Sequence, residues 1–158
     1  GTTGIQANDL IFRKLMRDGG ATARRIFADI GATVHDLAGS ERPELQGIAQ
    51  RLGSALQAWI DATEWLGVQG QSDLAGVLTA AVPYLHLAVT VAGGWQMARA
   101  AGVAAAKLAA GEGDATFYRA KIASARFYAD QLLPQAAACA ATVMAGSSGL
   151  MDLDDAMF

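Results

Sequence analysis

The sequence predicts an all-α protein, specifically an antiparallel four-helix up-down bundle preceded by a short N-terminal helix. Alanine fills 35 of the 158 positions, whereas valine and isoleucine together fill 15. Because alanine is the best helix former and β-branched residues favour strands, a β-sandwich is excluded. Apolar residues also recur at helical spacing between glycine-rich breaks, which indicates helices packed on one core.

The charge balance and the cysteine content narrow the classes of function. Twelve Lys and Arg against fifteen Asp and Glu give a formal charge of −3. This argues against nucleic-acid binding, which normally shows a basic patch. The single cysteine, Cys139, can form no internal disulfide and no thiolate zinc site. With no disulfide framework and no signal peptide, a cytoplasmic location is expected.

Two shorter helices are expected first, and glycine ends each of them. The first runs from Gly4 or Ile5 to Gly19-Gly20, where glycine supplies the left-handed C-terminal conformation. The second runs over residues 21–37 and ends at Gly39. Apolar residues at helical spacing mark their buried faces, which are Ile5, Phe12, Leu15 and Met16 in the first helix and Ile26, Phe27, Ile30, Val34 and Leu37 in the second.

The third predicted helix, residues 43–68, carries a heptad pattern. Ser40 is its candidate N-cap, and Pro43 lies in the first turn, where proline is tolerated. A large apolar residue recurs every seven positions with a second apolar residue between, as in a helix of a bundle: Leu45, Ile48, Leu52, Ala55, Trp59, Ala62 and Leu66.

The fourth predicted helix, residues 72–110, is the longest. It carries no charged residue from Leu74 to Met97, a length that could span a bilayer. Its proline, its glycines and its one-sided apolar pattern favour a buried bundle helix instead. We expect a kink at Pro83 and a close helix contact at Gly93-Gly94. The predicted buried face is Leu74, Leu78, Ala81, Leu85, Ala88, Ala92, Trp95 and Arg99.

A fifth stretch, residues 115–145, completes the predicted bundle. Asp114 is its candidate N-cap, and Pro134 is expected to bend it. An acidic tail, Leu150 to Phe158, comes after the break at residues 146–149. The mostly small residues of the predicted face would let helix axes approach closely; they are Ile122, Ala125, Ala129, Leu132, Ala136, Cys139 and Val143.

Few side chains could carry chemistry, and neither a catalytic set nor a metal site is predicted. His35 resembles the phospho-accepting histidine of phosphotransfer bundles, but Ala38 stands where those domains have a lysine, and the helix is expected to end at Gly39. His86 has no second His or Cys at ligand spacing. A buried Cys139 would act as a small hydrophobe. Three carboxylates lie in the tail, at Asp152, Asp154 and Asp155.

Two segments carry a more specific resemblance. Gly1-Thr2-Thr3-Gly4-Ile5-Gln6 resembles the segment that comes after the catalytic glutamate of acyl-CoA dehydrogenases and leads into a helix. Residues 125–136, Ala-Arg-Phe-Tyr-Ala-Asp-Gln-Leu-Leu-Pro-Gln-Ala, resemble the extra helical C-terminal domain of a bacterial subgroup of that family, the methylmercaptopropionyl-CoA dehydrogenase-like enzymes. The two matches bracket nearly the whole chain.

The resemblance implies roles for the first four residues. Gly1 matches the glycine beside the substrate thioester, and Thr2, Thr3 and Gly4 match the segment that contacts the FAD cofactor. Several relatives have a glutamine at the position of Gly4, so only backbone contact is implied there. Small residues at a helix N-terminus also suit a phosphate-bearing ligand. The glutamate base would precede Gly1, so no catalytic residue falls within the chain.

The function implied is that of the C-terminal part of a flavin-dependent acyl-CoA dehydrogenase, which oxidises the Cα–Cβ bond of an acyl-CoA. Residues 1–19 would be the last helix of the dehydrogenase helical domain, and residues 20–158 a C-terminal bundle. The chain alone is expected to be structural and catalytically inert. The implied partners are the N-terminal part of the same enzyme, the acyl-CoA, an electron-transfer flavoprotein as acceptor, and further copies in a homo-oligomer.

Two alternatives stay open. An autonomous helical interaction domain could use the same apolar faces, with Trp65 as an exposed anchor, since aromatic residues are enriched at interfaces. An initiator methionine near Gly1 would favour that alternative. A histidine phosphotransfer bundle would use His35, and acid-labile phosphate on that residue would support it.

Overall fold

The computed structural model of the chain describes residues 2–70, 72–147, 149 and 155–157. It contains no strand within these ranges, and the predicted all-α class is confirmed. In chain order the elements are α1 (Thr3–Asn8), the π-helix η1 (Asp9–Leu15), α2 (Ala21–Ala38), α3 (Pro43–Gln69), α4 (Leu74–Ala110), α5 (Ala115–Gln131), α6 (Gln135–Met144) and the 3₁₀-helix η2 (Asp155–Met157).

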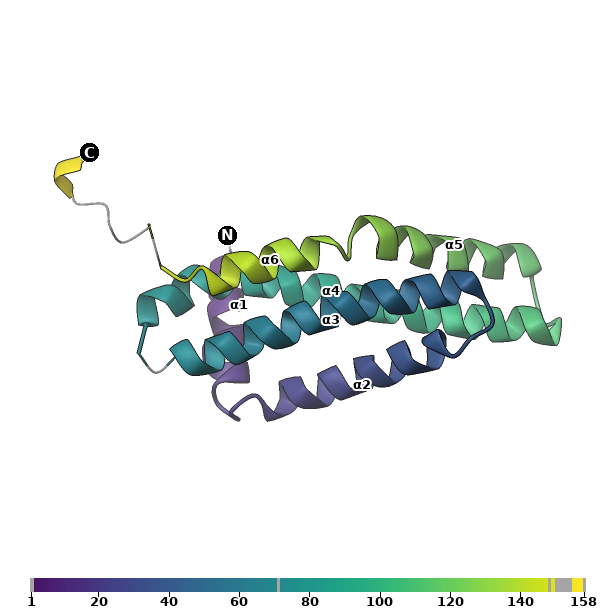
Figure 1. Cartoon of the computed structure of the whole chain (residues 1–158), viewed down its shortest axis with the longest axis horizontal. Helices are drawn as coiled ribbons and strands as arrows, with labels where there is room; N and C mark the ends of the chain where they lie inside the picture. Colours follow the sequence, from purple (N-terminus) through teal and green to yellow (C-terminus); the bar gives the residue numbers. More distant parts are fainter. Residues whose placement is uncertain (1, 71, 148, 150–154, 158) are drawn as a thin grey trace.

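The long helices lie lengthwise and run in alternating directions, while α1 and η1 cross them near one end (Figure 1). α3 and α4 lie at the centre, and each packs against α2 on one side and against α5 and α6 on the other. α2 has no contact with α5 or α6. The contacts therefore do not establish the closed four-helix bundle that the sequence predicts.

The heptad pattern of α3 is confirmed, because its predicted face is buried throughout, from Leu45 to Leu66. The predicted cap is wrong. Arg42 is the N-cap residue and Pro43 opens the helix, while the Ser40 hydroxyl accepts a hydrogen bond from the Arg42 N–H at 3.2 Å. Ser40 therefore stabilises the turn before α3, because its hydroxyl bonds to the N-cap residue itself and not to an N–H group inside the helix.

The predicted buried face of α4 is only partly right. Ala81 and Ala88 are buried, Leu85, Ala92 and Trp95 are half-buried, and Arg99 is exposed. Leu74 and Leu78 are 61% and 46% exposed, whereas the neighbouring Val77 and the more distant Tyr84 and Val91 are buried. The physical reason is that α4 is apolar on all sides, so hydrophobic spacing alone does not select the inward one. The cap is Asp73, whose carboxylate accepts a hydrogen bond from the Gly76 N–H at 2.8 Å.

The close contact predicted at Gly93-Gly94 is confirmed. A Cβ atom on Gly93 would lie 2.4 Å from the Tyr128 hydroxyl, and one on Gly94 would lie 2.5 Å from Cδ2 of Leu133. Only glycine allows this approach of α4 to the chain at the α5–α6 junction. α4 runs through Pro83 as one helix.

The predicted fifth helix is two helices, α5 and α6, separated at residues 132–134. Pro134 has no N–H, and its ring would clash with a carbonyl one turn earlier, so the helix stops rather than bends. The Asp114 cap is confirmed, since its carboxylate accepts from the N–H groups of Thr116 and Phe117. The predicted face is largely confirmed, since its other members are buried: Ile122, Ala125, Ala129, Ala136 and Val143. Leu132 and Cys139 are only half-buried, and the neighbouring Leu133 and Ala140 are buried in their place.

Candidate functional site

The segment that the sequence assigns to cofactor contact forms the start of α1. Thr2 is the N-cap residue, and its side chain makes no capping hydrogen bond. Thr2, Thr3 and Gly4 are all exposed, and a Cβ atom on Gly4 would meet nothing within 4 Å. Gly1, the predicted substrate contact, lies outside the described residues. The three residues thus present hydroxyl groups and free backbone N–H groups to their surroundings.

Three buried residues, Ala7, Ile11 and Leu15, hold α1 and η1 against the bundle. The predicted face was partly wrong, because Ile5 is 71% exposed and Phe12 is 37% exposed. The small side chain of Ala7, which has no exposed surface, lets α1 approach α4 closely. This contact fixes the position of the Thr2–Gly4 segment relative to α4.

The wider turns of η1 come directly after α1. The Met16 N–H donates to the Ile11 carbonyl five residues earlier, at 2.8 Å, and such π-type turns occur frequently at functional sites. The Asp9 carboxylate pairs with the Arg13 guanidinium. The hydrogen bond from Arg13 lowers the pKa of Asp9 below its usual value, so this carboxylate stays ionised at neutral pH.

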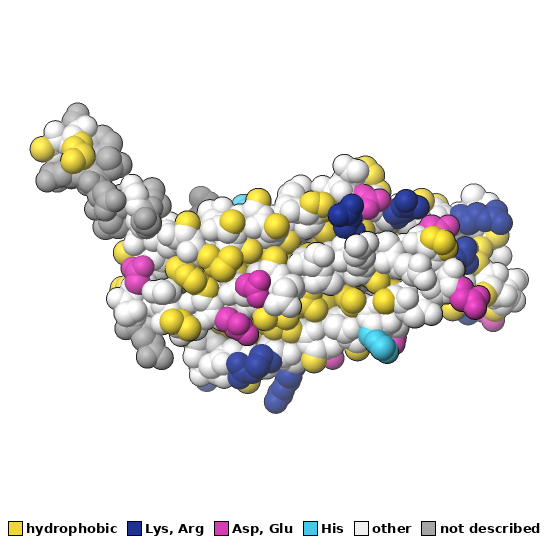
Figure 2. All heavy atoms as spheres, in the orientation of Figure 1, with side chains coloured by type: hydrophobic (Ala, Val, Ile, Leu, Met, Phe, Trp, Pro, Cys, Tyr) yellow, Lys and Arg dark blue, Asp and Glu magenta, His cyan; other side chains and the backbone are white. Residues whose placement is uncertain are grey.

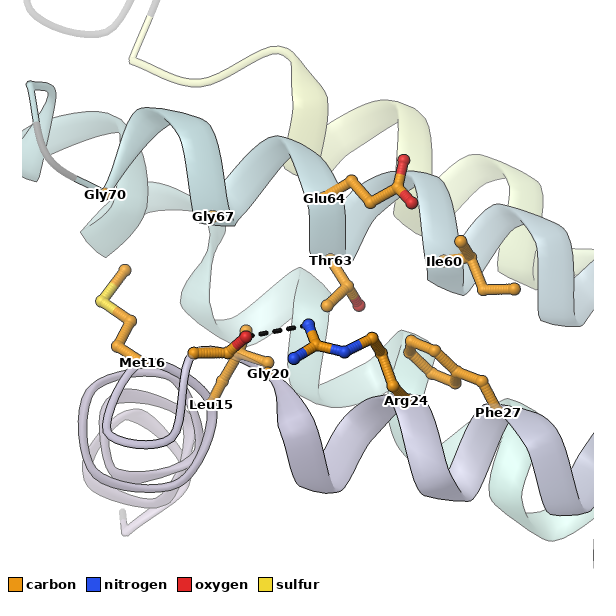
Figure 3. Close-up of a pocket in the computed structure, with 11 residues that line it drawn as sticks. Leu15, Met16, Gly20, Arg24, Phe27, Ile60, Thr63, Glu64, Gly67 and Gly70 are labelled. Atoms are coloured by element: carbon orange, nitrogen blue, oxygen red, sulfur yellow. Dashed lines mark hydrogen bonds between the residues drawn. The ribbon is translucent and has the colours of Figure 1, made fainter.

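A pocket of about 560 Å³ opens at the other end of η1, where the chain turns into α2 beside α3 (Figure 3). Gly19 and Gly20 form this turn with φ of 60° and 78°, which confirms the predicted helix stop. The wall is largely apolar, with one cationic and one anionic side chain: Leu15, Met16, Gly19, Gly20, Arg24, Phe27, Ile60, Thr63, Glu64, Gly67 and Gly70.

Hydrogen bonds fix the polar groups around this pocket. The Arg24 Nη1 donates to the Gly19 carbonyl at 2.9 Å, as Figure 3 shows. Thr63 donates to the Trp59 carbonyl at 2.7 Å, so the Tyr84 hydroxyl, 2.8 Å from the Thr63 oxygen, is the donor in that pair. Burial raises the pKa of Tyr84, which keeps the hydroxyl protonated. This arrangement suits binding of a mainly apolar group.

The remaining candidate residues stay apart from one another. His35 and His86 are both exposed, on α2 and α4, and α2 ends at Gly39 as predicted. Trp65 is half-buried rather than exposed, since its ring lies against Gly146. In the described part of the chain no three His, Cys, Asp or Glu side chains are grouped as metal ligands. Asp152 and Asp154 lie outside that part, as does the side chain of Asp155.

Sequence patterns did not predict the pocket. It depends on how η1 and α2 meet the end of α3, which is a tertiary angle that helical periodicity does not contain. One signal was present, because Gly67 and Gly70 lie three residues apart near the end of α3 and both line the pocket. Glycines at such spacing leave room beside a helix.

The chain is similar to known proteins along nearly its whole length. The family model described as acetyl-CoA dehydrogenase C-terminal like matches residues 26–154. The chain is 44% identical to 3-methylmercaptopropionyl-CoA dehydrogenase of Ruegeria pomeroyi over 138 residues, which cover 87% of this chain and 23% of that relative. It is 32% identical to the broad-specificity linear acyl-CoA dehydrogenase of Mycobacterium tuberculosis over 168 aligned residues, which cover 100% of this chain and 27% of that relative.

Proposed function

Because the chain belongs to the C-terminal part of the acyl-CoA dehydrogenase family, we propose that it completes a flavin-dependent enzyme that oxidises the Cα–Cβ bond of an acyl-CoA. The observation that carries this proposal is the alignment to two dehydrogenases, each matched over only 23% or 27% of its length. The two relatives are named for different acyl-CoA substrates, so the proposal extends to the acyl-CoA class.

The start of α1 fits a contact with FAD in the complete enzyme. Thr2, Thr3 and Gly4 are exposed, and α1 is held in place by the buried Ala7 and Ile11. Backbone N–H groups at the start of a helix, with small side chains around them, accommodate a phosphate-bearing ligand. When bound, FAD supplies the acceptor for the hydride from the substrate Cβ.

The chain itself positions groups and carries no base in this proposal. A glutamate directly before Gly1 removes the α-proton, and Gly1 lies beside the thioester. Residues 1–19 close the helical domain of the dehydrogenase, and residues 20–158 form the added bundle. The start of the family model at residue 26, after α1 and η1, supports this division. The chain without the preceding part is therefore inert.

The complete enzyme has partners that the chain alone does not need. Electrons leave through an electron-transfer flavoprotein, and the enzyme is a cytoplasmic homo-oligomer. Described residues of the chain offer exposed apolar side chains on α1 and α4 for contacts within such an assembly. The alternative of an autonomous interaction domain would use the same surfaces.

The reading frame upstream of Gly1 tests this proposal before any protein is made. A continuous frame with Tyr-Glu directly before Gly1 is expected. An initiator methionine at that point would overturn the proposal. The 158-residue chain mixed with FAD and an acyl-CoA is the control for the activity of the complete enzyme, and no flavin reduction is expected from it.

A further inference from the structure

The side of α4 that faces away from α3, α5 and α6 is unusually apolar. Leu78, Val82, Leu85 and Val89 succeed one another at spacings of four, three and four residues, so they lie on one side of the helix. Together with Leu74 we call them the outer face of α4. Leu74, Leu78 and Val89 are 61%, 46% and 62% exposed, and Val82 and Leu85 are half-buried.

No charged residue lies on this face between Asp73 and Arg99. The exposed polar side chains of that stretch of α4 are those of His86 and Gln96. Soluble proteins rarely expose a contiguous apolar patch to water, and such a patch marks an interaction site. α1 and η1 lie beside part of this face at Leu85, with Asp9 and Lys14 lining the same pocket. Among the described residues, Leu74, Leu78 and Val89 remain exposed on it.

The exposed aromatic residues of α5, unlike the outer face of α4, have charged neighbours. Phe117 and Phe127 are 52% and 65% exposed, but Arg119, Lys121 and Arg126 stand between them, and the Lys121 ammonium lies 5.1 Å from the centre of the Phe117 ring. Acidic and basic side chains are also scattered over the side of the molecule that Figure 2 presents. Charges at this density keep α5 in contact with solvent.

We propose that the outer face of α4 is the docking surface for the part of the same polypeptide that precedes α1, the dehydrogenase body. This rests on the proposed function for the existence of that body. The position of α1 is the reason for choosing the dehydrogenase body as the partner that covers the outer face of α4. α1 packs against α4, and its exposed Ile5 lines a shallow pocket together with Leu85. The dehydrogenase body of the proposed function is joined to the start of α1, beside this face.

Tethering favours this occupant over a second copy of the chain. A segment joined to α1 reaches the outer face at an effective concentration in the mM range, whereas a second copy must meet it by diffusion. The lengths of the relatives are consistent with such a tethered body. The matched region covers only 23% and 27% of the two relatives, so the larger part of each relative lies outside it. A bilayer is the other occupant that α4 fits by length and composition, although 44% of its most hydropathic window is buried inside the structure.

Thiol labelling of the full-length protein tests the docking surface. Val89→Cys and the matched control Phe127→Cys, each in a Cys139→Ala background, start from nearly equal exposure, 62% and 65%. A maleimide should label Cys at position 89 at least about tenfold more slowly than Cys at position 127, because a covered side chain reacts only when the interface opens. The modified peptides are quantified by mass spectrometry.

Three results would overturn the proposal. Equal labelling rates would show that nothing covers the face, and protection that disappears on dilution would assign it to a second copy. Protection that requires phosphatidylglycerol vesicles would assign it to a membrane. A second pair of variants checks the same point by stability: Val89→Lys should lower the Tm of the full-length protein, and Phe127→Lys should not. Flavin reduction by acyl-CoA, measured on the same preparation, separates failure of the docking surface from failure of the proposed function.

Discussion

Replacing Gly94 by alanine tests the close approach of α4 to the α5–α6 junction. A new Cβ would lie 2.5 Å from Cδ2 of Leu133 and 3.1 Å from its Cγ, well inside the roughly 3.5–4.0 Å of a favourable carbon contact. Leu133 is only 2% exposed, so its side chain has no solvent-facing side to move into. The added methyl group must therefore displace a packed residue.

The helix propensity of alanine and the cost of overpacking act in opposite directions at this position. Alanine gains about 1 kcal/mol over glycine inside a helix, and overpacking a filled core costs about 1–3 kcal/mol. We expect Gly94→Ala to destabilise the fold by about 1 kcal/mol, or roughly 2–4 °C in Tm for a chain of this size. Gly47→Ala is the matched control in α3, since a Cβ there meets nothing within 4 Å; it should raise the Tm by a similar amount.

A double-mutant cycle isolates the contact. In a Leu133→Ala background the new methyl group at position 94 enters vacated space, so Gly94→Ala should no longer be destabilising. The interaction energy should exceed about 0.5 kcal/mol, as for residues in direct contact. Thermal unfolding followed by circular dichroism measures all variants. If Gly94→Ala stabilises as much as Gly47→Ala, or costs the same with and without Leu133, the packing argument is wrong.

Two further predictions concern pH. Burial raises the pKa of Tyr84, so the protonated hydroxyl contributes its full stability below the unfolded pKa of about 10, and this contribution is lost above it. Tyr84→Phe should lower the free energy of unfolding by about 0.5–1.5 kcal/mol at pH 7, because the hydrogen bond to Thr63 is removed. The Tm of this variant should also fall less steeply at alkaline pH than that of the wild type. The hydrogen bond from the Thr22 side chain lowers the pKa of Asp18. Asp18→Ala should therefore reduce the Tm at pH 7, and the difference from wild type should shrink as the pH falls below about 4. Asp18 lies in the turn before α2, and Asp36→Ala within α2 is the control; an equal loss of Tm there would contradict the role assigned to Asp18.

The positions of most helices could be predicted from the sequence, because glycine and proline punctuate the chain. Gly19-Gly20, Gly39 and Asp114 mark ends that the structure confirms. The orientation of α3 was also predictable, since large apolar residues recur every seven positions on one side, from Leu45 to Leu66.

The orientation of α4 was not predictable, because a helix that is apolar all round gives no periodic signal. The break before Pro134 exchanges Leu132 for Leu133 in the core, although the predicted Ala136 and Val143 of α6 stay buried. Likewise the π-turns of η1 and the small Ala7 decide which side of the first helix is buried. In each case the tertiary contact, rather than local spacing, selects the face.

For the candidate site, the Thr2–Gly4 segment was found from its likeness to a family motif, and the structure places it at an exposed helix start. The pocket beside Arg24 and Glu64 was not found. Its lining comes from three elements brought together only by folding, and none of these residues forms a chemical motif in the sequence.

The most direct test of the proposed function is an anaerobic titration of the full-length protein with acyl-CoA substrates, followed by the absorbance of oxidised flavin. We predict that the purified protein carries FAD and that this absorbance falls on addition of an acyl-CoA. A full-length protein that binds no flavin, or whose flavin stays oxidised with short, medium and long acyl-CoAs alike, would contradict the proposed function.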